Sequence, residues 1–247
     1  ENLKEIIDKL NPDAVVNFAA QRPEGKSDSI SLYYRNLMVA ANIYEVCFEK
    51  NVYNIVDTSS RMIYSSDNSL SWSEEAAVNP SSYYALSKLW VEQTAAFFNK
   101  KGMMIKILRL AQVIGLGEKQ GFILQTYLNN ARKGLPIKVF GKEKGRRHYI
   151  YAKDVGNAIE AAIKKSEASG IFNIGMKNTY SFLDLAETIN KVFGGKSEIT
   201  KKPEAKADET IYHMSIKKAE RELGWSPGFD LRDAYLDLIK DIEYSSG

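Results

Sequence analysis

Asp13-Ala-Val-Val-Asn-Phe-Ala-Ala20 is a short and nearly all-apolar run that reads as a β-strand. A strand of this composition is buried on both faces, which is typical of a parallel sheet covered by helices. On one side of it, residues 2–10 have the pattern of an amphipathic helix. On the other side, residues 31–50 predict a second helix. The chain therefore begins with a strand set between two helices.

The same alternation continues along the chain. Residues 53–57 predict a strand, and Ser59-Ser60 lie at its end. Pro80-Ser81-Ser82 is a helix-start signal, and the apolar pattern that follows runs to Lys100-Lys101, with Gly102 as the stop. Residues 104–110 predict the next strand. Strands and helices joined by short links predict an α/β fold with a Rossmann-like doubly wound parallel sheet and right-handed crossovers.

The pattern loosens after Gly115, which predicts a smaller C-terminal α/β lobe. We expect residues 1–112 to form an incomplete cofactor domain, rejoined by about 149–175, and residues 113–148 and 176–247 to form a substrate-binding lobe. Asp154 is expected to cap a helix over 155–165, and Ser181 with Asp184 predicts a capping box. The remaining expected elements are helices at 122–133, 182–193, 216–223 and 231–244 and strands at 137–140, 148–151 and 171–175.

Composition narrows the function classes. The 247 residues carry a net charge of +3, which does not indicate a nucleic-acid partner. The two histidines stand alone in the sequence, so we expect no metal site. We see no apolar run long enough to span a membrane and no signal peptide. The single cysteine, Cys47, cannot form an internal disulfide, so we expect a cytoplasmic protein with Cys47 in its core.

Tyr84 and Lys88 lie one helical turn apart in Ser82-Tyr-Tyr-Ala-Leu-Ser-Lys88, downstream of Ser60. A serine, tyrosine and lysine together can move a proton on and off a sugar or alcohol hydroxyl, which points to redox chemistry with a bound hydride carrier. The spacing alone is weak evidence, because Tyr149 and Lys153 repeat it. That second pair begins in a predicted strand, where four residues are too far apart to share a proton.

These features resemble the extended short-chain dehydrogenase/reductase family, the NAD-dependent sugar-nucleotide epimerases and dehydratases. The likeness covers almost the whole chain, and its motifs arrive in family order. They are Val16-Asn-Phe-Ala-Ala20, Asn36, Asp57-Thr-Ser-Ser60 with Ile63-Tyr64, Tyr84-Ala-Leu-Ser-Lys88, Leu108-Arg109, Val113-Ile-Gly115, Gly141 to Arg147 before Tyr149-Ile-Tyr151, Asp154-Val155, Phe172-Asn-Ile-Gly175 and Leu223-Gly-Trp225.

The resemblance implies a role for each catalytic candidate. Tyr84 would be the base or acid on the substrate hydroxyl, and Lys88 would lower its pKa and bind the nicotinamide ribose. Ser60 would position the reacting oxygen, and Asn36 would help to orient the lysine side of the relay. The cofactor is expected to be NAD, with NADP left open, and its expected contacts are Ala19, Ala20, Gln21, Ser59, Tyr84 and Lys88.

For the substrate, the resemblance implies a nucleotide sugar. Arg147 matches the arginine that grips the diphosphate, and Gln112 stands where relatives usually carry an asparagine. Val139 is a further substrate-binding candidate. Ala205 occupies the position of a second family arginine, for which neighbouring Lys206 is a possible replacement. Many relatives dimerise through the helices that here carry Asn36 and Tyr84, so a homodimer is expected.

The residues after Ser60 bear on the reaction. Related 4,6-dehydratases carry an Asp-Glu pair there, and this chain has Arg61-Met62, which disfavours dehydration. A 4-epimerase needs only Ser60, Tyr84, Lys88 and tightly held NAD. A reductase would use the same residues with an exchangeable cofactor. We expect 4-epimerisation first, and reduction and dehydration remain the alternatives. A truncated, non-catalytic binding or assembly module is the alternative of another class.

One family feature does not occur in these 247 residues, the Gly-x-x-Gly-x-x-Gly loop that holds the cofactor pyrophosphate. Gly115-Leu-Gly117 follows a late strand and does not replace it. Because the first residue is Glu1, we expect a processed chain or a fragment. If it were the whole polypeptide, we would expect little cofactor binding, an exposed sheet edge and poor stability without a partner.

Overall fold

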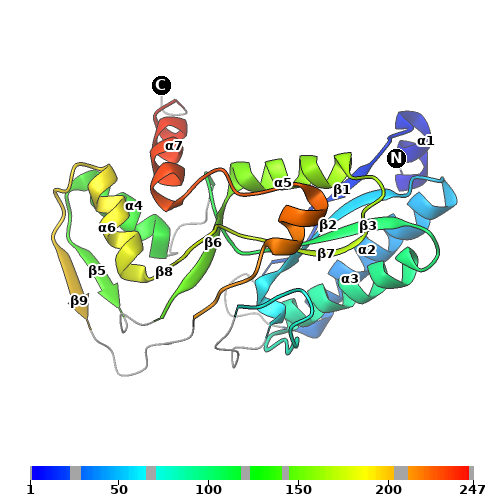
Figure 1. Cartoon of the computed structure of the whole chain (residues 1–247), viewed down its shortest axis with the longest axis horizontal. Helices are drawn as coiled ribbons and strands as arrows, with labels where there is room; N and C mark the ends of the chain where they lie inside the picture. The colour runs from blue at the N-terminus through cyan, green and yellow to red at the C-terminus, as the bar shows by residue number, and fades with distance from the viewer. Residues whose placement is uncertain are drawn as a thin grey trace.

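The computed structural model describes residues 2–22, 29–64, 71–117, 123–140, 145–202 and 211–244. Figure 1 shows an elongated molecule with two lobes that meet near β6. The elements of the described residues are α1 (Leu3–Leu10), β1 (Val15–Asn17), α2 (Ile30–Glu49), β2 (Asn54–Ser60), η1 (Arg61–Ile63), α3 (Tyr83–Asn99), β3 (Met104–Leu110), β4 (Gln112–Ile114), α4 (Ile123–Lys133), β5 (Ile137–Phe140), β6 (Arg147–Tyr151), α5 (Ala152–Lys164), β7 (Gly170–Ile174), β8 (Thr179–Tyr180), α6 (Phe182–Val192), β9 (Ile199–Lys202), η2 (Ala219–Leu223) and α7 (Leu231–Tyr244).

The first lobe is built on a parallel sheet with strand order β1-β2-β3-β7. Helices α2 and α3 cover one face and α5 covers the other (Figure 1). The register pairs Asn17 with Asp57 and Ser60 with Leu110, so the carboxyl ends of β2 and β3 finish level. The apolar residues inside β2 and β3 are almost completely buried, as expected for a sheet covered on both faces, and only Met104 and Leu110 at the ends of β3 are partly buried. The predicted α/β fold with a doubly wound parallel sheet is confirmed.

Strand β1 is shorter than the predicted strand over 13–20. It ends at Asn17, whose Oδ1 accepts a hydrogen bond from the Ala19 backbone N–H at 3.0 Å. This bond turns the chain out of the sheet, and Phe18 is exposed as a result. Within the described residues β1 lies at an edge of the sheet, with β2 as its neighbour. The chain after Asn17 therefore lies at the carboxyl end of the sheet, beside β2.

Helix α3 begins as the sequence predicts. Ser82 is its N-cap, and the Ser82 hydroxyl accepts a hydrogen bond from the Ala85 backbone N–H at 3.2 Å. The helix buries Val91 and Ala95 in a core shared with α2, β2 and β3. This packing fixes the first two turns of α3 beside the end of β2.

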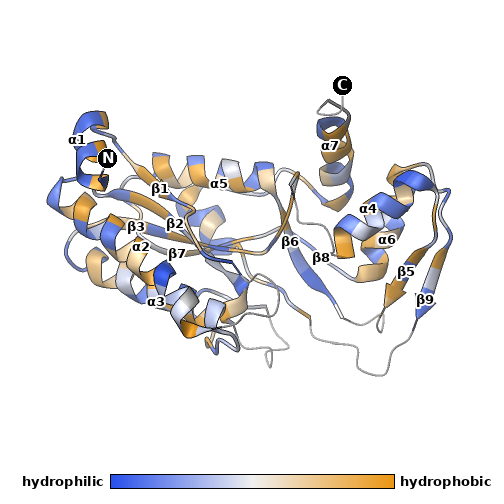
Figure 2. Ribbon diagram, turned by 180° about the vertical axis from the view of Figure 1, so that it is seen from behind, coloured by the Kyte–Doolittle hydropathy of each residue, from blue (hydrophilic) through white to orange (hydrophobic). Residues whose placement is uncertain are grey.

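In the part of the chain that the structure describes, the second lobe contains two small sheets and three α-helices. One sheet has the order β4-β6-β8, and the other is the parallel pair β5 and β9. In Figure 2, β5 is mainly hydrophobic and its partner β9 is mainly hydrophilic. Helices α4, α6 and α7 pack around a shared core that includes Leu128, Ile137, Leu185 and Tyr235. The predicted capping box at Ser181 and Asp184 begins α6.

The prediction that Asp154 caps a helix is wrong. Helix α5 begins at Ala152, and Asp154 lies fully buried in its first turn. The Asp154 carboxylate instead accepts hydrogen bonds from the backbone N–H groups of Gly228, at 2.9 Å, and Phe229, at 3.1 Å. A carboxylate with two backbone donors can be buried at low cost, so Asp154 fastens the segment that leads into α7.

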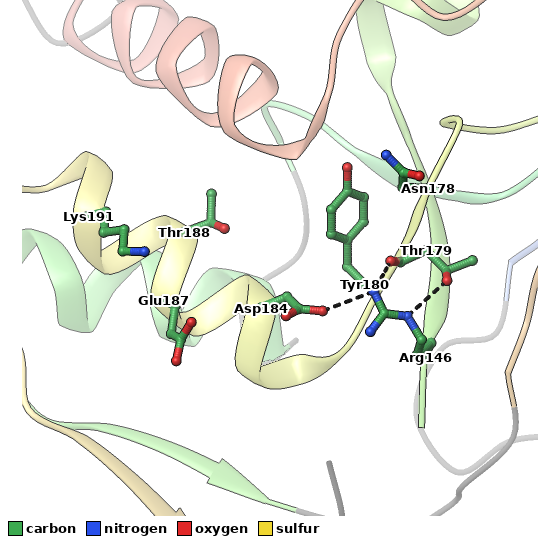
Figure 3. A pocket seen from close by; sticks show the side chains of 8 residues that line it. All are labelled: Arg146, Asn178, Thr179, Tyr180, Asp184, Glu187, Thr188 and Lys191. Carbon is green, nitrogen blue, oxygen red and sulfur yellow. Dashed lines mark hydrogen bonds and ion pairs between the residues drawn. The ribbon is translucent and has the colours of Figure 1, made fainter. Parts of the chain in front are cut away.

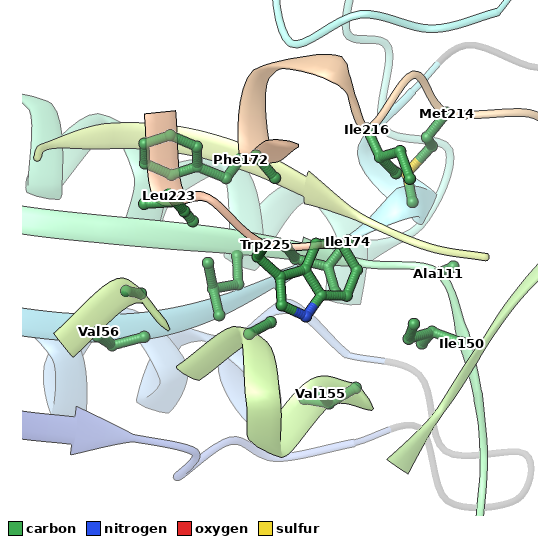
Figure 4. Packing of buried hydrophobic residues seen from close by; sticks show 14 of the residues in the cluster. Val56, Ala111, Ile150, Val155, Phe172, Ile174, Met214, Ile216, Leu223 and Trp225 are labelled. Carbon is green, nitrogen blue, oxygen red and sulfur yellow. The ribbon is translucent and has the colours of Figure 1, made fainter. Parts of the chain in front are cut away.

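Residues 214–225 differ from the expected division into lobes. They were expected in the substrate-binding lobe, yet Met214, Leu223 and Trp225 pack against β2, β3, β7 and α5 of the first lobe (Figure 4). Trp72 holds the start of this segment, because its backbone N–H donates to the His213 carbonyl at 2.7 Å and its backbone carbonyl accepts from the Ser215 N–H at 2.8 Å. The chain thus crosses back to the first lobe before it forms α7.

Candidate active site

The predicted catalytic residues lie around the carboxyl end of β2. Ser60 is the last residue of the strand, and its hydroxyl accepts a hydrogen bond from the Met62 N–H at 3.2 Å. Tyr84 is in the first turn of α3, and Lys88 follows one turn later. In open parallel sheets, ligands bind beyond the carboxyl ends of the strands, which is where these residues lie.

Tyr84 is partly buried beside another tyrosine. The ring of Tyr33, from α2, packs edge-on against it with ring centres 6.1 Å apart. Burial raises the pKa of Tyr84 above its ordinary value, whereas the positive charge of Arg22 acts to lower it. The sequence predicts Lys88 in that tuning role, whereas in the structure Arg22 is the cation whose charge acts to lower the pKa of Tyr84.

Lys88 is buried, with 4% of its surface exposed. Its Nζ donates a hydrogen bond to the Thr58 carbonyl, two residues before Ser60, at 2.8 Å. Burial lowers the pKa of Lys88, and the negative charges of Asp57 and Glu92 raise it. The ammonium is therefore held against β2 by one backbone hydrogen bond, and the charges of Asp57 and Glu92 partly offset the effect of its burial.

A buried network surrounds Asp57 on β2. Its Oδ2 accepts hydrogen bonds from Asn17 Nδ2, at 2.8 Å, and from the Tyr44 hydroxyl, at 2.7 Å. Its Oδ1 accepts from the Thr58 N–H at 2.6 Å. Asn17 also holds the Ala19 N–H. One carboxylate thus links the turn after β1 to the residue that anchors Lys88.

A second buried network is centred on Asn36 of α2. Asn36 Oδ1 accepts from the Gln21 N–H at 2.6 Å, and its Nδ2 donates to the Gln21 carbonyl at 3.1 Å. The same Nδ2 donates to the Ser87 hydroxyl at 3.0 Å, and that hydroxyl donates to the Tyr84 carbonyl at 2.8 Å. Asn36 therefore connects the predicted cofactor loop to the turn of α3 that carries Tyr84.

The residues predicted to contact a cofactor lie together at this end of the sheet. Ala19 is exposed, and Ala20 and Gln21 are partly buried in the turn after β1. Ser59 lies two residues beyond Asp57 and therefore on the same face of β2. Its hydroxyl is buried, with no hydrogen-bond partner among the described residues. Small side chains and an unsatisfied buried hydroxyl fit a bound polar molecule such as a dinucleotide.

The predicted diphosphate-binding residue is held by aromatic rings. The Arg147 guanidinium carbon lies 4.5 Å from the ring centre of Tyr212 and 5.5 Å from that of Phe182. Arg61, directly after Ser60, places its guanidinium carbon 5.3 Å from the same Tyr212 ring. Two cations from different lobes thus meet at one tyrosine, which is a suitable arrangement for an anionic group.

In the described part of the chain, the other substrate-binding candidates do not share the cation–ring contacts of Arg147 with Tyr212 and Phe182. Gln112 begins β4, where it pairs with Tyr149 and is partly buried. The side chain of Val139 lies in the core of the second lobe, because alternate residues of β5 face inward, and its contact with a substrate stays a prediction. Ala205 and Lys206 lie outside the described residues.

The second tyrosine–lysine pair does not form a site. Tyr149 is fully buried in β6, whereas Lys153 is on α5 with its Nζ 2.5 Å from Asp237 and 2.9 Å from Asp241. Tyr149 is therefore in the core, whereas Lys153 is in ion pairs at the surface, and the two side chains are in different environments.

A polar cavity of about 440 Å³ lies in the second lobe, apart from these residues. Arg146 crosses it to Thr179 and Asp184 (Figure 3). None of the predicted catalytic, cofactor or substrate residues lines it. In the described ranges no three acidic, histidine or cysteine side chains are grouped as a metal site would need. No helix there is both long and apolar enough to cross a membrane.

Sequence reasoning missed the residues that support the site: Asn17, Asp57, Ser87 and Tyr212. Asp57 carried the clearest signal, because a carboxylate inside an otherwise apolar strand needs buried partners. Asn17, in the nearly apolar run that became β1, carried the same signal. Ser87 and Tyr212 gave none, since their contacts come from chain segments far apart in sequence.

Comparisons with known proteins identify the family of this chain. The model of the NAD dependent epimerase/dehydratase family matches residues 1–175. The dTDP-4-dehydro-6-deoxyglucose reductase of Escherichia coli is 29% identical over 98% of this chain and 78% of its own length. A putative UDP-glucose 4-epimerase of Methanocaldococcus jannaschii is 30% identical over 97% of this chain and 80% of its own.

A solved structure is similar over the same extent. The UDP-N-acetylglucosamine 4-epimerase from Bacillus cereus superposes with a TM-score of 0.88 and 31% identity, covering 98% of this chain and 81% of that one. The family model and these relatives together establish the membership that the motifs suggested. This chain belongs to the NAD dependent epimerase/dehydratase family.

Proposed function

We propose that this protein is an NAD-dependent 4-epimerase of a nucleotide sugar, with Tyr84 as the acid and base. The observation that carries the proposal is the gathering of Ser60, Tyr84 and Lys88 at the carboxyl end of β2. The network of Asp57 holds the lysine side, and that of Asn36 holds the tyrosine side. Such rigid support suits residues that must meet a reacting hydroxyl with correct geometry.

The residues proposed to hold NAD are Ala19, Ala20, Gln21 and Ser59, with Tyr84 and Lys88. When bound, NAD supplies the acceptor for the hydride that leaves the sugar carbon and the donor that returns it. Ser59 offers a buried hydroxyl that lacks a partner in the described structure. The turn after β1 is fixed by Asn17 at Ala19 and by Asn36 at Gln21, so its backbone is preorganised for a ligand.

The protein's own residues would manage the proton and the position of the sugar. Tyr84 takes the proton from the 4-hydroxyl as that carbon is oxidised, and it returns the proton when the ketone is reduced on its other face. Ser60 donates a hydrogen bond to the same oxygen. Lys88 and Arg22 place positive charge on the tyrosine side, which favours the phenolate. Arg147 binds the diphosphate through its planar guanidinium.

A net reductase is the second candidate, because the Escherichia coli relative is a reductase by name. A screen of UDP- and dTDP-linked sugars against the full-length protein separates the two. The epimerase gives the C4 epimer without net change in cofactor. The reductase consumes one reduced cofactor for each 4-keto sugar. Absence of both reactions, with nucleotide sugar bound, would instead favour a non-catalytic binding module.

We further propose a homodimer that forms through α2 and α3. Ile30, Tyr34 and Met38 recur every four residues on α2 and are each about half exposed, so they form an apolar stripe on its surface. Tyr34→Glu combined with Met38→Glu should convert the dimer into a folded monomer in light scattering. A wild-type protein that is monomeric at high concentration would contradict this assembly.

A cytoplasmic location is also proposed. Cys47 is buried and unpaired, and burial raises the pKa of its thiol to about 11. An inert thiol in the core is compatible with a reducing compartment. Fractionation of cells that produce the protein tests this location directly.

A further inference from the structure

Asp57 is the one charged residue of β2, and it is almost completely buried. Three donors surround its carboxylate: Asn17 Nδ2, the Tyr44 hydroxyl and the Thr58 N–H, all within 2.8 Å. An ionised carboxylate only accepts hydrogen bonds, whereas a protonated carboxyl group must also donate one. Three donors around the carboxylate therefore favour an ionised Asp57.

Lys88 is bonded to Thr58, the residue next to Asp57 on β2. Asp57 holds the N–H of Thr58, and Lys88 Nζ holds its carbonyl. The carboxylate and the ammonium therefore flank one residue of β2, and each is fixed by the backbone there. A buried ammonium needs a compensating charge, because its desolvation is unfavourable.

The other charges near Lys88 already have partners. Glu92, one turn further along α3, forms a two-pronged ion pair with Arg109 of β3, at 3.0 and 2.8 Å. Tyr44, from α2, is directed at Asp57, and burial together with the Asp57 charge raises its pKa well above the ordinary value. Tyr44 therefore stays neutral, and Asp57 is the carboxylate left to balance Lys88.

We propose that Asp57 is a positioning residue, which supplies the counter-charge for the Lys88 ammonium and fixes, through Thr58, where that ammonium lies. Asp57 reaches the proposed cofactor side through Asn17, which holds the turn after β1 at Ala19. One carboxylate would then set both the charge of the lysine and the position of the turn that faces the cofactor. The inference deepens the proposed function, since it concerns the role of Lys88 there.

The test measures the charge of Lys88 without turnover, so it remains valid if the proposed reaction proves wrong. In protein labelled with ¹³C at the lysine side chains, the Lys88 signal, assigned by its absence in Lys88→Met, is followed through a pH titration. Asp57→Asn removes the charge and keeps the shape. Its Lys88 midpoint should fall by at least about one pH unit, the lower end of the effect of a nearby opposite charge.

Tyr44→Phe is the matched control, because it removes a hydrogen bond from the same carboxylate and leaves the charge in place. Its Lys88 midpoint should stay within about 0.3 unit of the wild-type value, a small part of the effect expected from a nearby charge. An unchanged midpoint in Asp57→Asn, or an equal fall in Tyr44→Phe, would overturn the proposal.

A measurement on the wild-type protein keeps the proposal testable if Asp57→Asn does not fold. In protein labelled with ¹³C at aspartate, the carboxyl carbon of Asp57 should have the chemical shift of an ionised carboxylate at every pH near neutrality. It should also show a small step at the Lys88 midpoint, because the two charges interact. A protonated Asp57 at neutral pH would overturn the assignment.

Discussion

Asn36 Nδ2 donates a hydrogen bond to the Ser87 hydroxyl at 3.0 Å, and this bond joins α2 to the turn of α3 that holds Tyr84. The two residues are 51 positions apart in sequence, and both are buried. Because Asn36 also holds both backbone groups of Gln21, it fixes the turn after β1 and the Tyr84 helix in one frame.

Asn36→Ala should weaken both cofactor binding and folding. The substitution leaves the Gln21 N–H and carbonyl without their partner, at about 1–3 kcal/mol for each buried polar group that stays unsatisfied. We expect the dissociation constant for NAD, measured by calorimetry on the full-length protein, to rise about tenfold, which corresponds to about 1.4 kcal/mol.

Ser87→Ala is the matched control, since it removes the link to α3 and keeps both bonds to Gln21. Its NAD affinity should change by less than that of Asn36→Ala. Equal effects of the two substitutions would show that the Gln21 bonds do not position the cofactor turn.

The buried ion pair of Glu92 and Arg109 should behave as a coupled unit. Both side chains are almost fully buried, and Arg109 also donates to the Tyr64 hydroxyl at 2.8 Å. Removing one charge leaves the other unpaired, so Glu92→Gln and Arg109→Met should each lower the free energy of unfolding by about 3–5 kcal/mol.

The double variant should lose less than the sum of the two single losses, because it leaves no isolated charge. Urea unfolding of the four proteins measures this coupling. Additive losses would mean that the pair makes no favourable interaction beyond its separate packing.

His148 should make the free energy of unfolding depend on pH, between the pKa of its side chain in the folded protein and the pKa in the unfolded chain. Its Nε2–H donates to the Met176 carbonyl at 2.5 Å, and its Nδ1 accepts from the Met214 N–H at 3.0 Å, so the ring is neutral. Burial lowers the pKa of His148 to about 4, from 6.5 in the unfolded chain. The unfolded state binds the proton more readily, so this contribution is fully present above pH 6.5 and is lost as pH falls toward about 4.

The loss should reach about 3 kcal/mol in urea unfolding, which follows from the difference between the two pKa values. His148→Gln should flatten this part of the pH profile. Gly175→Ala is the contrast: an added Cβ would lie 2.5 Å from the His148 ring, so this variant should lose stability at every pH. A wild-type profile that is flat over this range would contradict a buried neutral His148.

Arg147→Ala should weaken substrate binding more than turnover. Its guanidinium stacks on Tyr212 and is proposed to hold a diphosphate in both ground and transition states. Loss of such uniform binding should raise KM by about tenfold or more, as for a charge-assisted contact, and should leave kcat nearly constant. Arg147→Lys should recover little, because lysine lacks the planar fork.

Arg146→Ala is the control, since Arg146 is the preceding residue and is bound to Thr179 and Asp184 in the second lobe. Its KM should stay close to the wild-type value. A larger rise in KM from Arg146→Ala than from Arg147→Ala would indicate that the diphosphate binds at Arg146 and not at Arg147.

The alternating strands and helices could be predicted from the sequence because each element carries its own periodicity and end signals. Ser82 and the Ser181–Asp184 capping box are examples, since both act within one turn of a helix. Predictions failed where the partner is distant in sequence. Asp154 has the form of a cap, yet its partners are Gly228 and Phe229.

The candidate site follows the same division. The spacing of Tyr84 and Lys88 is local and could be read from the sequence. The anchoring of Lys88 on Thr58 depends on how α3 packs on β2, and the effect of the Arg22 charge on the pKa of Tyr84 depends on where the turn after β1 lies. The burial of Val139 follows from strand alternation, which places its side chain in the core of the second lobe.

Turnover by Tyr84→Phe in the full-length protein tests the central claim most directly. The substitution removes the hydroxyl and keeps the ring that packs on Tyr33. We predict that kcat for the sugar nucleotide found in the screen falls by about 10²–10⁴, as expected for loss of a general acid and base, while NAD affinity stays near the wild-type value. An unchanged kcat would remove Tyr84 from the chemistry and contradict the proposed function.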